Sequence, residues 1–370
     1  MRWPRLVTIS LFSMLILFLC FSDNLPATDY QIGVYYFPGW NSRSEYWNDL
    51  MGLSGSRSPG KAWLDREPLR GFGYPEESEK IAEQNIEWAS NSSISFFAYD
   101  WYWDGRKTYL NHAINNHLKS KNKHKMKFCV LWANHSNIPE SLEDFTGMVQ
   151  YWIDNYLKDS QYLTVSGKPV VIVFSPQQLR DNAKRIKMTT KELFTIARDM
   201  AVRSGLNGIY FVGATQANSY WVNNYLPTNS YDAITAYNYH SADFDGQYTG
   251  NERPSESFDE LLSGYKKQWS WIQKNSKLPY IVPMSAGWDR RPWGGSRVLS
   301  HDRSGSDPTT FKEMLVAGRD TICKDPNHSL KMGIIYAWNE FGEGAYIEPT
   351  KKWGFLYLQV IKEVFRRPCK

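Results

Sequence analysis

The run Met332-Gly-Ile-Ile-Tyr-Ala-Trp338 continues directly into Asn339-Glu-Phe-Gly-Glu343, and this stretch is the most informative one in the chain. Its first part is continuously apolar, which is typical of a strand buried on both faces of a parallel sheet. Its second part places two carboxylates, Glu340 and Glu343, at the end of that strand among aromatic rings. Paired acids of this kind can supply a general acid and a base or nucleophile for sugar chemistry. An isolated pair could equally be a solvated acidic turn, so the rest of the chain must discriminate between the two.

Seven more apolar runs precede this one, and segments with helical periodicity separate most of them. The runs are 32–37, 94–99, 127–132, 169–174, 208–213, 233–237 and 280–284, and the helical segments are 76–90, 145–157, 190–204, 258–275 and 309–323. An eightfold strand–helix repeat predicts an α/β fold with a single (β/α)8 TIM barrel. A doubly wound sheet is the alternative, but no Gly-rich turn follows the first strand.

Two long loops are expected at the carboxyl-terminal face of the barrel, where active sites of this fold are built. They follow strands 1 and 7 and comprise residues 41–75 and 286–308. The polar and aromatic residues at the strand ends should converge on the same face. The candidate substrate-binding residues are Tyr36, Trp40, Asp100, Trp101, Trp103, Trp132, Asn134, His135, Tyr237, Asn238, Tyr239, Trp288, Trp338 and Asn339, and the candidate catalytic residues are Glu340 and Glu343.

Each of these candidates also has a purely structural interpretation. Asp100 could be a helix N-cap, His135 and His240 could be structural histidines, and the segment 237–240 could be a turn with packed rings. The functional interpretation gains weight because all of these groups fall at the same end of their strands.

Composition narrows the function further. Aromatic residues make up 15% of the 370 residues, with 16 Trp and 23 Tyr, and such rings often line grooves for carbohydrate or peptide. A net charge of +5 without a basic stripe does not indicate a nucleic-acid partner. No Cys/His cluster has zinc spacing, so neither a metal nor another cofactor is expected. We expect a monomer that binds a glycan or polysaccharide.

Residues 1–27 have the pattern of a signal peptide. Arg2 and Arg5 precede an uncharged, mostly apolar run over 6–21, and Leu25-Pro-Ala27 ends in a small residue. The run of about 16 residues is just short of a membrane span, so a signal anchor is the alternative, and lipidation at Cys20 is a weaker one. The protein is therefore expected to be secreted, periplasmic or in a secretory-pathway lumen, with 28–370 as its catalytic domain. Cys323 and Cys369 could pair in such a compartment.

The chain resembles the family 99 glycoside hydrolases, which include endo-α-mannosidases, and the related WbsX-like proteins. The resemblance covers roughly residues 31 to 360. It is carried by Gly33-Val-Tyr-Tyr-Phe-Pro-Gly-Trp40, Phe96-Phe-Ala-Tyr-Asp-Trp-Tyr-Trp103, Phe128-Cys-Val-Leu-Trp-Ala-Asn-His135 and the segment 337–349 followed by Trp353-Gly-Phe-Leu-Tyr-Leu358.

The resemblance implies a (β/α)8 barrel and separate roles for the two glutamates. Glu340 would act as a base toward the sugar 2-hydroxyl, through an anhydro-sugar intermediate with net retention, and Glu343 would be the general acid/base. The chain has Gly342 where endo-mannosidases carry a histidine, which favours the WbsX-like group.

These patterns predict an exported retaining glycoside hydrolase that cleaves an α-linked glycan or polysaccharide. The first alternative is a WbsX-like glycosyltransferase of polysaccharide or O-antigen synthesis, for which Asp243-Phe-Asp245 offers a D-x-D sequence. The second alternative is a catalytically silent carbohydrate-binding barrel, and the presence of both glutamates argues against it.

Overall fold

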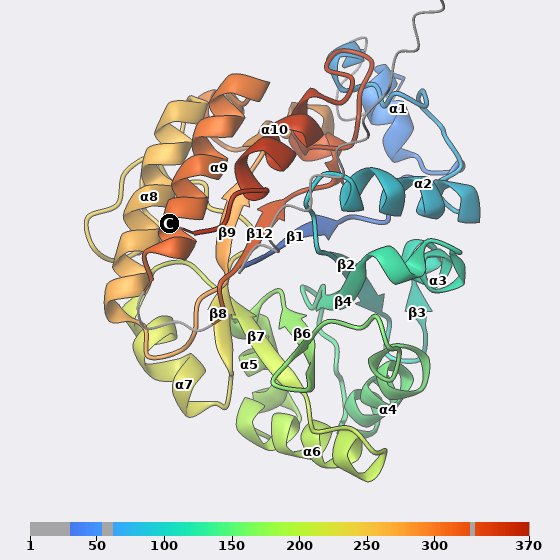
Figure 1. The fold of residues 1–370 in the computed structure, drawn as a ribbon. Helices are drawn as coiled ribbons and strands as arrows, with labels where there is room; N and C mark the ends of the chain where they lie inside the picture. The colour runs from blue at the N-terminus through green and yellow to red at the C-terminus, as the bar shows by residue number, and fades with distance from the viewer. Residues whose placement is uncertain (1–29, 54–61, 326–329, 370) are drawn as a thin grey trace, which may run out of the picture.

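The chain folds into a (β/α)8 barrel in the computed structural model, which describes residues 30–53, 62–325 and 330–369 (Figure 1). Eight strands form the barrel in the order β8-β7-β6-β4-β2-β1-β12-β9, and every neighbouring pair on this path is parallel. Their bounds are β1 Gln31–Tyr36, β2 Phe96–Trp103, β4 Lys127–Trp132, β6 Lys168–Val173, β7 Tyr210–Ala214, β8 Ala233–Thr235, β9 Val282–Ser285 and β12 Met332–Tyr336.

The barrel closes between β8 and β9, the two strands at the ends of that order. Ile234 in β8 forms a parallel bridge with Tyr280, which lies just before β9. The Ile234 N–H donates to the Pro279 carbonyl at 2.9 Å, and the Ile281 N–H donates to the Ile234 carbonyl at 2.9 Å. The predicted TIM barrel is confirmed, and all eight predicted apolar runs are barrel strands.

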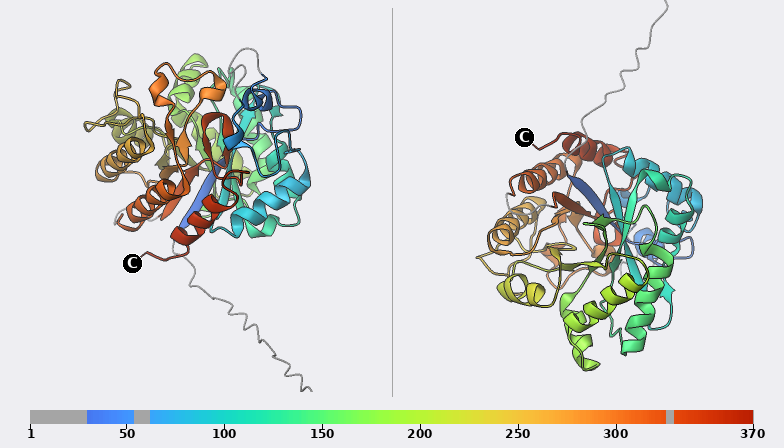
Figure 2. Two further views of the ribbon diagram at one scale, coloured as in Figure 1. Left: turned by 90° about the horizontal axis from the view of Figure 1, so that it is seen from above. Right: turned by 60° about the horizontal axis from the view of Figure 1, so that its bottom comes forward.

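Helices surround the strands, as the views in Figures 1 and 2 show. Their bounds are α1 Tyr46–Met51, α2 Glu79–Ser90, α3 His112–Lys119, α4 Leu142–Trp152, α5 Pro176–Arg185, α6 Thr190–Arg203, α7 Leu226–Thr228, α8 Phe258–Asn275, α9 Pro308–Cys323 and α10 Leu356–Phe365. The five predicted helical segments correspond to α2, α4, α6, α8 and α9. Helix α5 was not predicted, because its sequence is mostly polar. Leu179 and Ala183 are apolar residues on its buried face, and polar residues separate them. Its start is instead defined by the Ser175 side chain, which accepts a hydrogen bond from the Gln178 N–H at 3.1 Å.

The predicted long loops after β1 and β9 contain short elements of their own. The first loop carries α1 and the 3₁₀ turn η1 Leu64–Arg66, and its residues 54–61 lie outside the described ranges. The second carries the strand pair β10 Gly287–Trp288 and β11 Ser304–Gly305, with the 3₁₀ turns η5 Arg291–Trp293 and η6 Leu299–His301.

The remaining short elements are attached to the barrel strands or extend its helices. The short strands are β3 Thr108–Tyr109, β5 Thr164–Val165, β13 Asn339–Glu340 and β14 Ala345–Tyr346, and the short helical turns are η2 Lys123–Lys125, η3 Ile153–Leu157, η4 Tyr220–Tyr225 and η7 Phe341–Glu343. Strand β2 runs further than predicted, because β3 pairs with Tyr102 and Trp103 and extends it as a hairpin. This extension adds residues 100–103 to the carboxyl end of the second strand.

The predicted leader, residues 1–27, lies outside the described ranges, so it and the domain boundary at residue 28 stay predictions. Within residues 30–53, 62–325 and 330–369, no helix combines the length and hydropathy that a bilayer crossing requires. Helix α10 packs on α9 (Figure 2), and a disulfide joins Cys323 at the end of α9 to Cys369 beyond α10.

Candidate active site

A cavity of about 460 Å³ lies at the carboxyl ends of the barrel strands. This volume is within the range of about 300–1,000 Å³ that is typical of small-molecule sites. We call this cavity the acidic pocket. Its lining residues are Phe37, Tyr46, Asp100, Tyr102, Tyr109, Leu110, Ala133, His135, Phe174, Tyr237, Asn238, His240, Trp288, Trp293, Glu340 and Glu343.

The Tyr237 hydroxyl lies between two carboxyl groups of the acidic pocket. It is 2.8 Å from Oδ2 of Asp100 and 2.8 Å from Oε1 of Glu340. A phenol has a single hydrogen to donate, so it can donate to only one of these oxygens at a time. Both contacts are hydrogen bonds only if one of the two carboxyl groups is itself protonated and donates to the phenol oxygen. The geometry therefore favours one shared proton on Asp100 and Glu340.

Burial favours the same protonation state. It raises the pKa of Asp100 well above its ordinary value, and the nearby Glu343 adds to this effect, while the Tyr237 hydrogen bond opposes it. Burial likewise raises the pKa of Glu340 well above its ordinary value, with Glu343 and Asp100 adding to the shift and Tyr237 again opposing it. Three carboxyl groups this close in a desolvated pocket cannot all be ionised at low cost.

Glu343 has different neighbours from those of Glu340. Burial raises its pKa, but the Tyr336 hydroxyl donates a hydrogen bond to its Oε2, and the positive charge of Arg290 is nearby. Both of these interactions favour the ionised form of Glu343. These interactions favour protonation of Asp100 or Glu340 over protonation of Glu343.

The two acids that share Tyr237 each keep one unused acceptor. Oδ1 of Asp100 and Oε2 of Glu340 are buried and have no hydrogen-bond partner within the described part of the chain. Three nitrogen atoms of pocket residues are in the same situation, namely Trp288 Nε1, Trp293 Nε1 and His240 Nδ1. Buried polar atoms normally have partners, so water or a polar ligand is expected to complete those of these atoms that it can reach from the cavity.

The period of two along a strand decides which predicted residues reach the acidic pocket. In β2, Asp100 and Tyr102 line it, whereas Trp101 and Trp103 point to the helical layer. The Trp101 ring lies 5.4 Å from the Trp152 ring of α4. Trp103 Nε1 donates to Oδ1 of Asp144 in α4 at 2.6 Å. These two tryptophans were predicted as substrate-binding residues, and the structure places them in the barrel–helix interface instead.

The same alternation separates the residues at the end of β4. Trp132 packs against α4 with its ring 5.6 Å from that of Trp152, while Ala133 and His135 line the acidic pocket. Asn134 is buried and exchanges two hydrogen bonds of 2.8 Å with the backbone of Ser175. Asn134 therefore joins β4 to the start of α5 and does not face the pocket. Burial lowers the pKa of His135, so its imidazole is neutral at neutral pH.

Other predicted substrate-binding residues also lie behind the lining. Tyr36 accepts a hydrogen bond from Asn85 Nδ2 of α2 at 3.0 Å. The Tyr239 hydroxyl lies 2.8 Å from that of Tyr280. Trp338 packs against Phe97 at 5.1 Å. Of the predicted substrate-binding residues, the ones that line the acidic pocket are Asp100, His135, Tyr237, Asn238 and Trp288.

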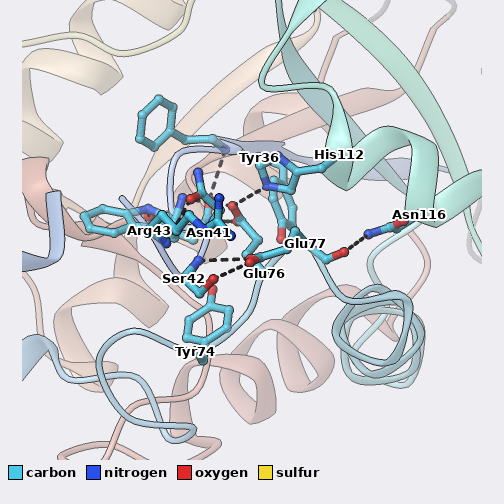
Figure 3. Close-up of polar contacts among 12 residues, drawn as sticks. Tyr36, Asn41, Ser42, Arg43, Tyr74, Glu76, Glu77, His112 and Asn116 are labelled. Atoms are coloured by element: carbon cyan, nitrogen blue, oxygen red, sulfur yellow. Dashed lines mark hydrogen bonds and ion pairs between the residues drawn. The ribbon is translucent and has the colours of Figure 1, made fainter. Parts of the chain in front are cut away.

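Trp40 and Asn339 position the end of β12 rather than line the pocket. Glu76 is buried, and its Oε2 accepts from the Trp40 N–H at 2.8 Å and pairs with His112 Nε2 at 2.9 Å (Figure 3). Its Oε1 accepts from Asn339 Nδ2 at 3.0 Å. Asn339 accepts from the Phe37 N–H at 2.9 Å, and Trp40 Nε1 donates to the Asn339 carbonyl at 2.6 Å. This network fixes the backbone immediately before the first catalytic candidate.

Several pocket residues were not among the residues predicted from the sequence. The aromatic and apolar ones are Phe37, Tyr46, Tyr102, Tyr109, Leu110, Ala133, Phe174 and Trp293, and His240 joins them. Alternation along β2 would have selected Tyr102 together with Asp100. Burial, His301 and Arg290 lower the pKa of His240 to about 3, so this side chain is also neutral. Tyr46, Tyr109 and Trp293 come from loops, whose placement no local pattern predicts.

Arg66 joins the three loops that surround the catalytic candidates. Its guanidinium is buried, forms an ion pair of 2.6 Å with Asp289, and donates hydrogen bonds of 2.8 Å to the carbonyls of Asp289 and Phe341. Arg291 forms a second ion pair of 2.6 Å with the same carboxylate. A planar guanidinium with several donors is suited to such a junction. The loop after β1 is thereby fastened to the loop after β9 and to η7.

Gly342 lies directly beneath the Trp293 ring. A Cβ atom at position 342 would be 2.1 Å from Cε2 of that indole, closer than any real contact. The glycine is therefore required by the position of Trp293, and the tryptophan fills the space that a side chain at 342 would occupy. Trp293 and Gly342 therefore form this part of the pocket wall together.

The acidic D-x-D sequence lies away from the acidic pocket. Asp243 and Asp245 line a separate, smaller cavity, and Asp243 accepts a hydrogen bond from the Arg253 N–H at 2.9 Å. In the described ranges, no three His, Cys, Asp or Glu residues are grouped closely enough to hold a metal ion.

Fold and pocket together define a (β/α)8 barrel with a buried group of carboxylic acids at the carboxyl ends of its strands. The chain belongs to the family described as glycosyltransferase WbsX, whose model matches residues 65–361. The protein WxcX from Xanthomonas campestris pv. campestris (strain B100) is 20% identical in an alignment of 324 residues, and the match covers 80% of this chain and 42% of that protein. The chain therefore spans less than half of the length of this curated relative.

Solved structures with the same fold include glycoside hydrolases. The family 99 endo-α-mannosidase from Bacteroides thetaiotaomicron superposes with a TM-score of 0.64 at 16% identity, covering 90% of this chain and 96% of that one. A glycoside hydrolase-like protein superposes with a TM-score of 0.65 at 16% identity, covering 91% and 94%. The predicted resemblance to family 99 and WbsX-like proteins is confirmed at the level of family and fold.

Proposed function

We propose that this protein is a retaining glycoside hydrolase that cleaves an α-linked glycan or polysaccharide at the acidic pocket. The observation that carries the proposal is the placement of Glu340, Glu343 and Asp100 around one cavity at the active end of the barrel. Their raised pKa values allow a protonated and an ionised carboxyl group to coexist near neutral pH. The endo-α-mannosidase that shares the fold supports an α-linked substrate.

The family resemblance suggests how the two glutamates divide the work. Glu340 takes the proton of the sugar 2-hydroxyl, whose oxygen bonds to the anomeric carbon while the glycosidic bond breaks and Glu343 protonates the leaving oxygen. Glu343 then takes a proton from water, the water oxygen bonds to the anomeric carbon, and Glu340 returns its proton to the 2-oxygen. Two inversions at the anomeric carbon give net retention.

The resting electrostatics set a condition on this mechanism. Tyr336 and Arg290 favour ionised Glu343, whereas Glu340 shares a proton with Asp100 through Tyr237. Before the first step, Glu340 must be ionised and Glu343 protonated. Asp100 can retain the shared proton and leave Glu340 ionised, and a glycan oxygen near Glu343 would favour its protonated form by excluding water.

The direct test replaces each glutamate by its amide. We expect Glu343→Gln to abolish cleavage of α-linked glycans, a loss of at least about a hundredfold because general acid–base catalysis contributes about 10²–10⁴, while glycan binding and folding persist. A panel of α-linked glycans with the product anomer followed by proton NMR reports reaction, sugar and stereochemistry together. Undiminished turnover by Glu343→Gln would refute the assignment.

The roles of the two glutamates are separated by a substrate that needs no acid. On an aryl glycoside with a good leaving group, loss of the general acid is tolerated in the first step, whereas loss of the base is not. We expect Glu343→Gln to retain bond cleavage on this substrate and Glu340→Gln to lose it. The opposite result would reverse the two roles, in agreement with the resting proton distribution.

A glycosyltransferase is the second candidate, because the family description names that activity. Asp243 and Asp245 line a different cavity from the catalytic candidates and therefore do not support a D-x-D site at the acidic pocket. Consumption of a sugar nucleotide that Asp243→Ala abolishes would establish the transferase. The pattern of residues 1–27 and the disulfide between Cys323 and Cys369 support export, and an exported protein would be away from most sugar nucleotides.

A further inference from the structure

A second cavity adjoins the acidic pocket across a wall of three residues. It has a volume of about 450 Å³ and shares Phe174, Tyr237 and Asn238 with the acidic pocket. Its other lining residues are Ser175, Pro176, Gln177, Ala214, Thr215, Gln216, Asn218, Trp221, Ala236, Tyr248, Thr249 and Gly250. We call it the neighbouring cavity. It lies at the carboxyl ends of β6, β7 and β8, the same face of the barrel as the catalytic candidates.

The shared wall places the two cavities in direct succession. The Phe174 ring contacts the Tyr237 ring at 5.2 Å on one side and the His135 ring at 5.6 Å on the other. Tyr237 in turn reaches Asp100 and Glu340 with its hydroxyl. The two cavities are therefore adjacent and have Phe174, Tyr237 and Asn238 as common lining residues.

The lining of the neighbouring cavity has amide and hydroxyl groups together with aromatic rings. None of the residues that line it is Asp, Glu, Lys, Arg or His within the part of the chain that the structure describes. The N-terminal turn of α5, residues 175–177, is part of this lining, but no cationic side chain of the lining accompanies it to match the charge of a diphosphate. Neutral amides, hydroxyls and ring faces suit the hydroxyls and the apolar face of an uncharged pyranose.

Gln216 supplies an open acceptor at the junction of the two cavities. Its Nε2 donates to the Asn238 carbonyl at 3.1 Å, which holds the amide beside the shared wall. Its Oε1 is buried and has no hydrogen-bond partner within the described ranges. A sugar hydroxyl that donates to this oxygen would complete it.

The aromatic side of the neighbouring cavity is held rigidly. The Arg180 guanidinium lies 5.0 Å from the centre of the Trp221 ring, and the Tyr225 ring contacts the same indole at 4.9 Å. The Tyr248 N–H donates to the Ala217 carbonyl at 2.6 Å, so the segment that carries Tyr248 is tied to the end of β7. Rings that are already held in place lose little entropy when a sugar packs on them.

We propose that the neighbouring cavity is a second sugar subsite, so that the substrate is an uncharged oligosaccharide or polysaccharide that spans Phe174 and Tyr237. The inference rests on the proposed function, since the first sugar lies at Glu340 and Glu343. The bond that is cleaved then joins or lies next to sugar units held in the two cavities. Trp221 and Gln216 become specificity residues for chain length.

The test measures how binding and cleavage depend on chain length. The probes are α-linked manno-, gluco-, galacto- and rhamno-oligosaccharides of one to six units, labelled at the reducing end. We expect affinity for full-length Glu343→Gln, and kcat/KM for the wild type, to rise at least about tenfold between one unit and three. Trp221→Ala should remove most of this rise, Gln216→Ala should reduce it, and Trp221→Phe should keep most of it.

A matched control is Trp88→Ala on α2, because Trp88 is also covered by an arginine, with Arg70 at 4.0 Å, and lines neither cavity. It should keep the full dependence on chain length. Circular dichroism of each variant reports folding. Glutamate-dependent cleavage that does not vary with length, or a rise that persists in Trp221→Ala, would overturn the second subsite alone. Absence of both binding and cleavage across the panel would overturn the proposed function with it.

Discussion

The single hydrogen of the Tyr237 hydroxyl governs the proton balance of the acidic pocket. It faces Asp100 and Glu340 at equal distances of 2.8 Å, and its hydrogen bond lowers the pKa of each acid while burial raises both. The net pKa of Glu340 is therefore a balance between desolvation and one phenol. A group whose folded pKa is raised is protonated over a wider pH range, so the ionised base is recovered only at higher pH.

Tyr237→Phe should move this balance in a known direction. Loss of the hydrogen bond lets the pKa of Glu340 rise further, so the acidic limb of the kcat/KM–pH profile should shift to higher pH. A hydrogen bond to a charged group contributes about 1.5–3 kcal/mol, which corresponds to about one to two pH units. Tyr239→Phe is the matched control, because its hydroxyl contacts Tyr280 outside the acidic pocket. A limb that stays in place or moves to lower pH in Tyr237→Phe would contradict this account.

At the scale of elements, the pocket wall depends on how the turn η7 fits under the turn η5. Trp293 of η5 covers Gly342 of η7 so closely that no side chain fits between them. Arg66 holds the same two segments through the Asp289 and Phe341 carbonyls. The open Nε1 of Trp293 is consequently held at a defined place in the pocket.

Gly342→Ala tests this fit. The added methyl must displace Trp293, so we expect a loss of about 1–3 kcal/mol in the free energy of unfolding, as for overpacked sites, and a raised KM for the glycan. Gly305→Ala is the control in the same loop system, because nothing lies within 4 Å of a Cβ there. It should change stability by less than about 0.5 kcal/mol.

A double variant separates the clash from other effects. Trp293→Ala removes the ring that a Cβ at 342 would meet, so Gly342→Ala should cost much less stability in that background. Additive losses of stability in the Trp293→Ala, Gly342→Ala double variant would show that the close approach is not the cause.

For the whole molecule, the end of the chain is fastened to the last large helix of the barrel. The disulfide joins Cys323 and Cys369, which are 46 positions apart in the sequence, and the loop that it closes contains α10, β12 and η7. Closing a loop of this length restricts the unfolded chain and contributes roughly 4 kcal/mol in the chain-entropy treatment. The segment that contains both glutamates therefore lies within a loop that this disulfide closes.

Removal of this disulfide should lower stability without changing the acidic pocket. We expect the Cys323→Ser, Cys369→Ser double variant to lose about 2–4 kcal/mol in the free energy of unfolding, measured in urea. Dithiothreitol should lower the Tm of the wild type and leave that of the double variant unchanged. Cys129 is buried and present in both proteins, so it serves as an internal control. A wild-type Tm that does not respond to the reductant would contradict the prediction.

The barrel could be predicted because its signal is local. Each strand is a continuous apolar run. The eighth run is followed within a few residues by Glu340 and Glu343, whose carboxyl groups indicate acid–base chemistry. Helix α5 was not predicted, because its start is defined by the Ser175 cap and by Pro176 rather than by a continuous apolar face. Trp101 and Trp103 were predicted as substrate-binding residues, because their spacing alone does not show which face of β2 lines the pocket.

Local patterns in the amino-acid sequence are sufficient for the eight strands, for their carboxyl ends on one face of the barrel and for the two candidate glutamates after the eighth strand, because each of these follows from residues that are close together in the chain. The tertiary structure brings Tyr237 into contact with both Asp100 and Glu340, which are 137 and 103 positions away from it in the sequence. It also decided that Trp40 and Asn339 support the site from behind and that Trp293 requires Gly342. Closure of the barrel and the packing of its loops bring these residues together, and no pattern within one segment contains that information.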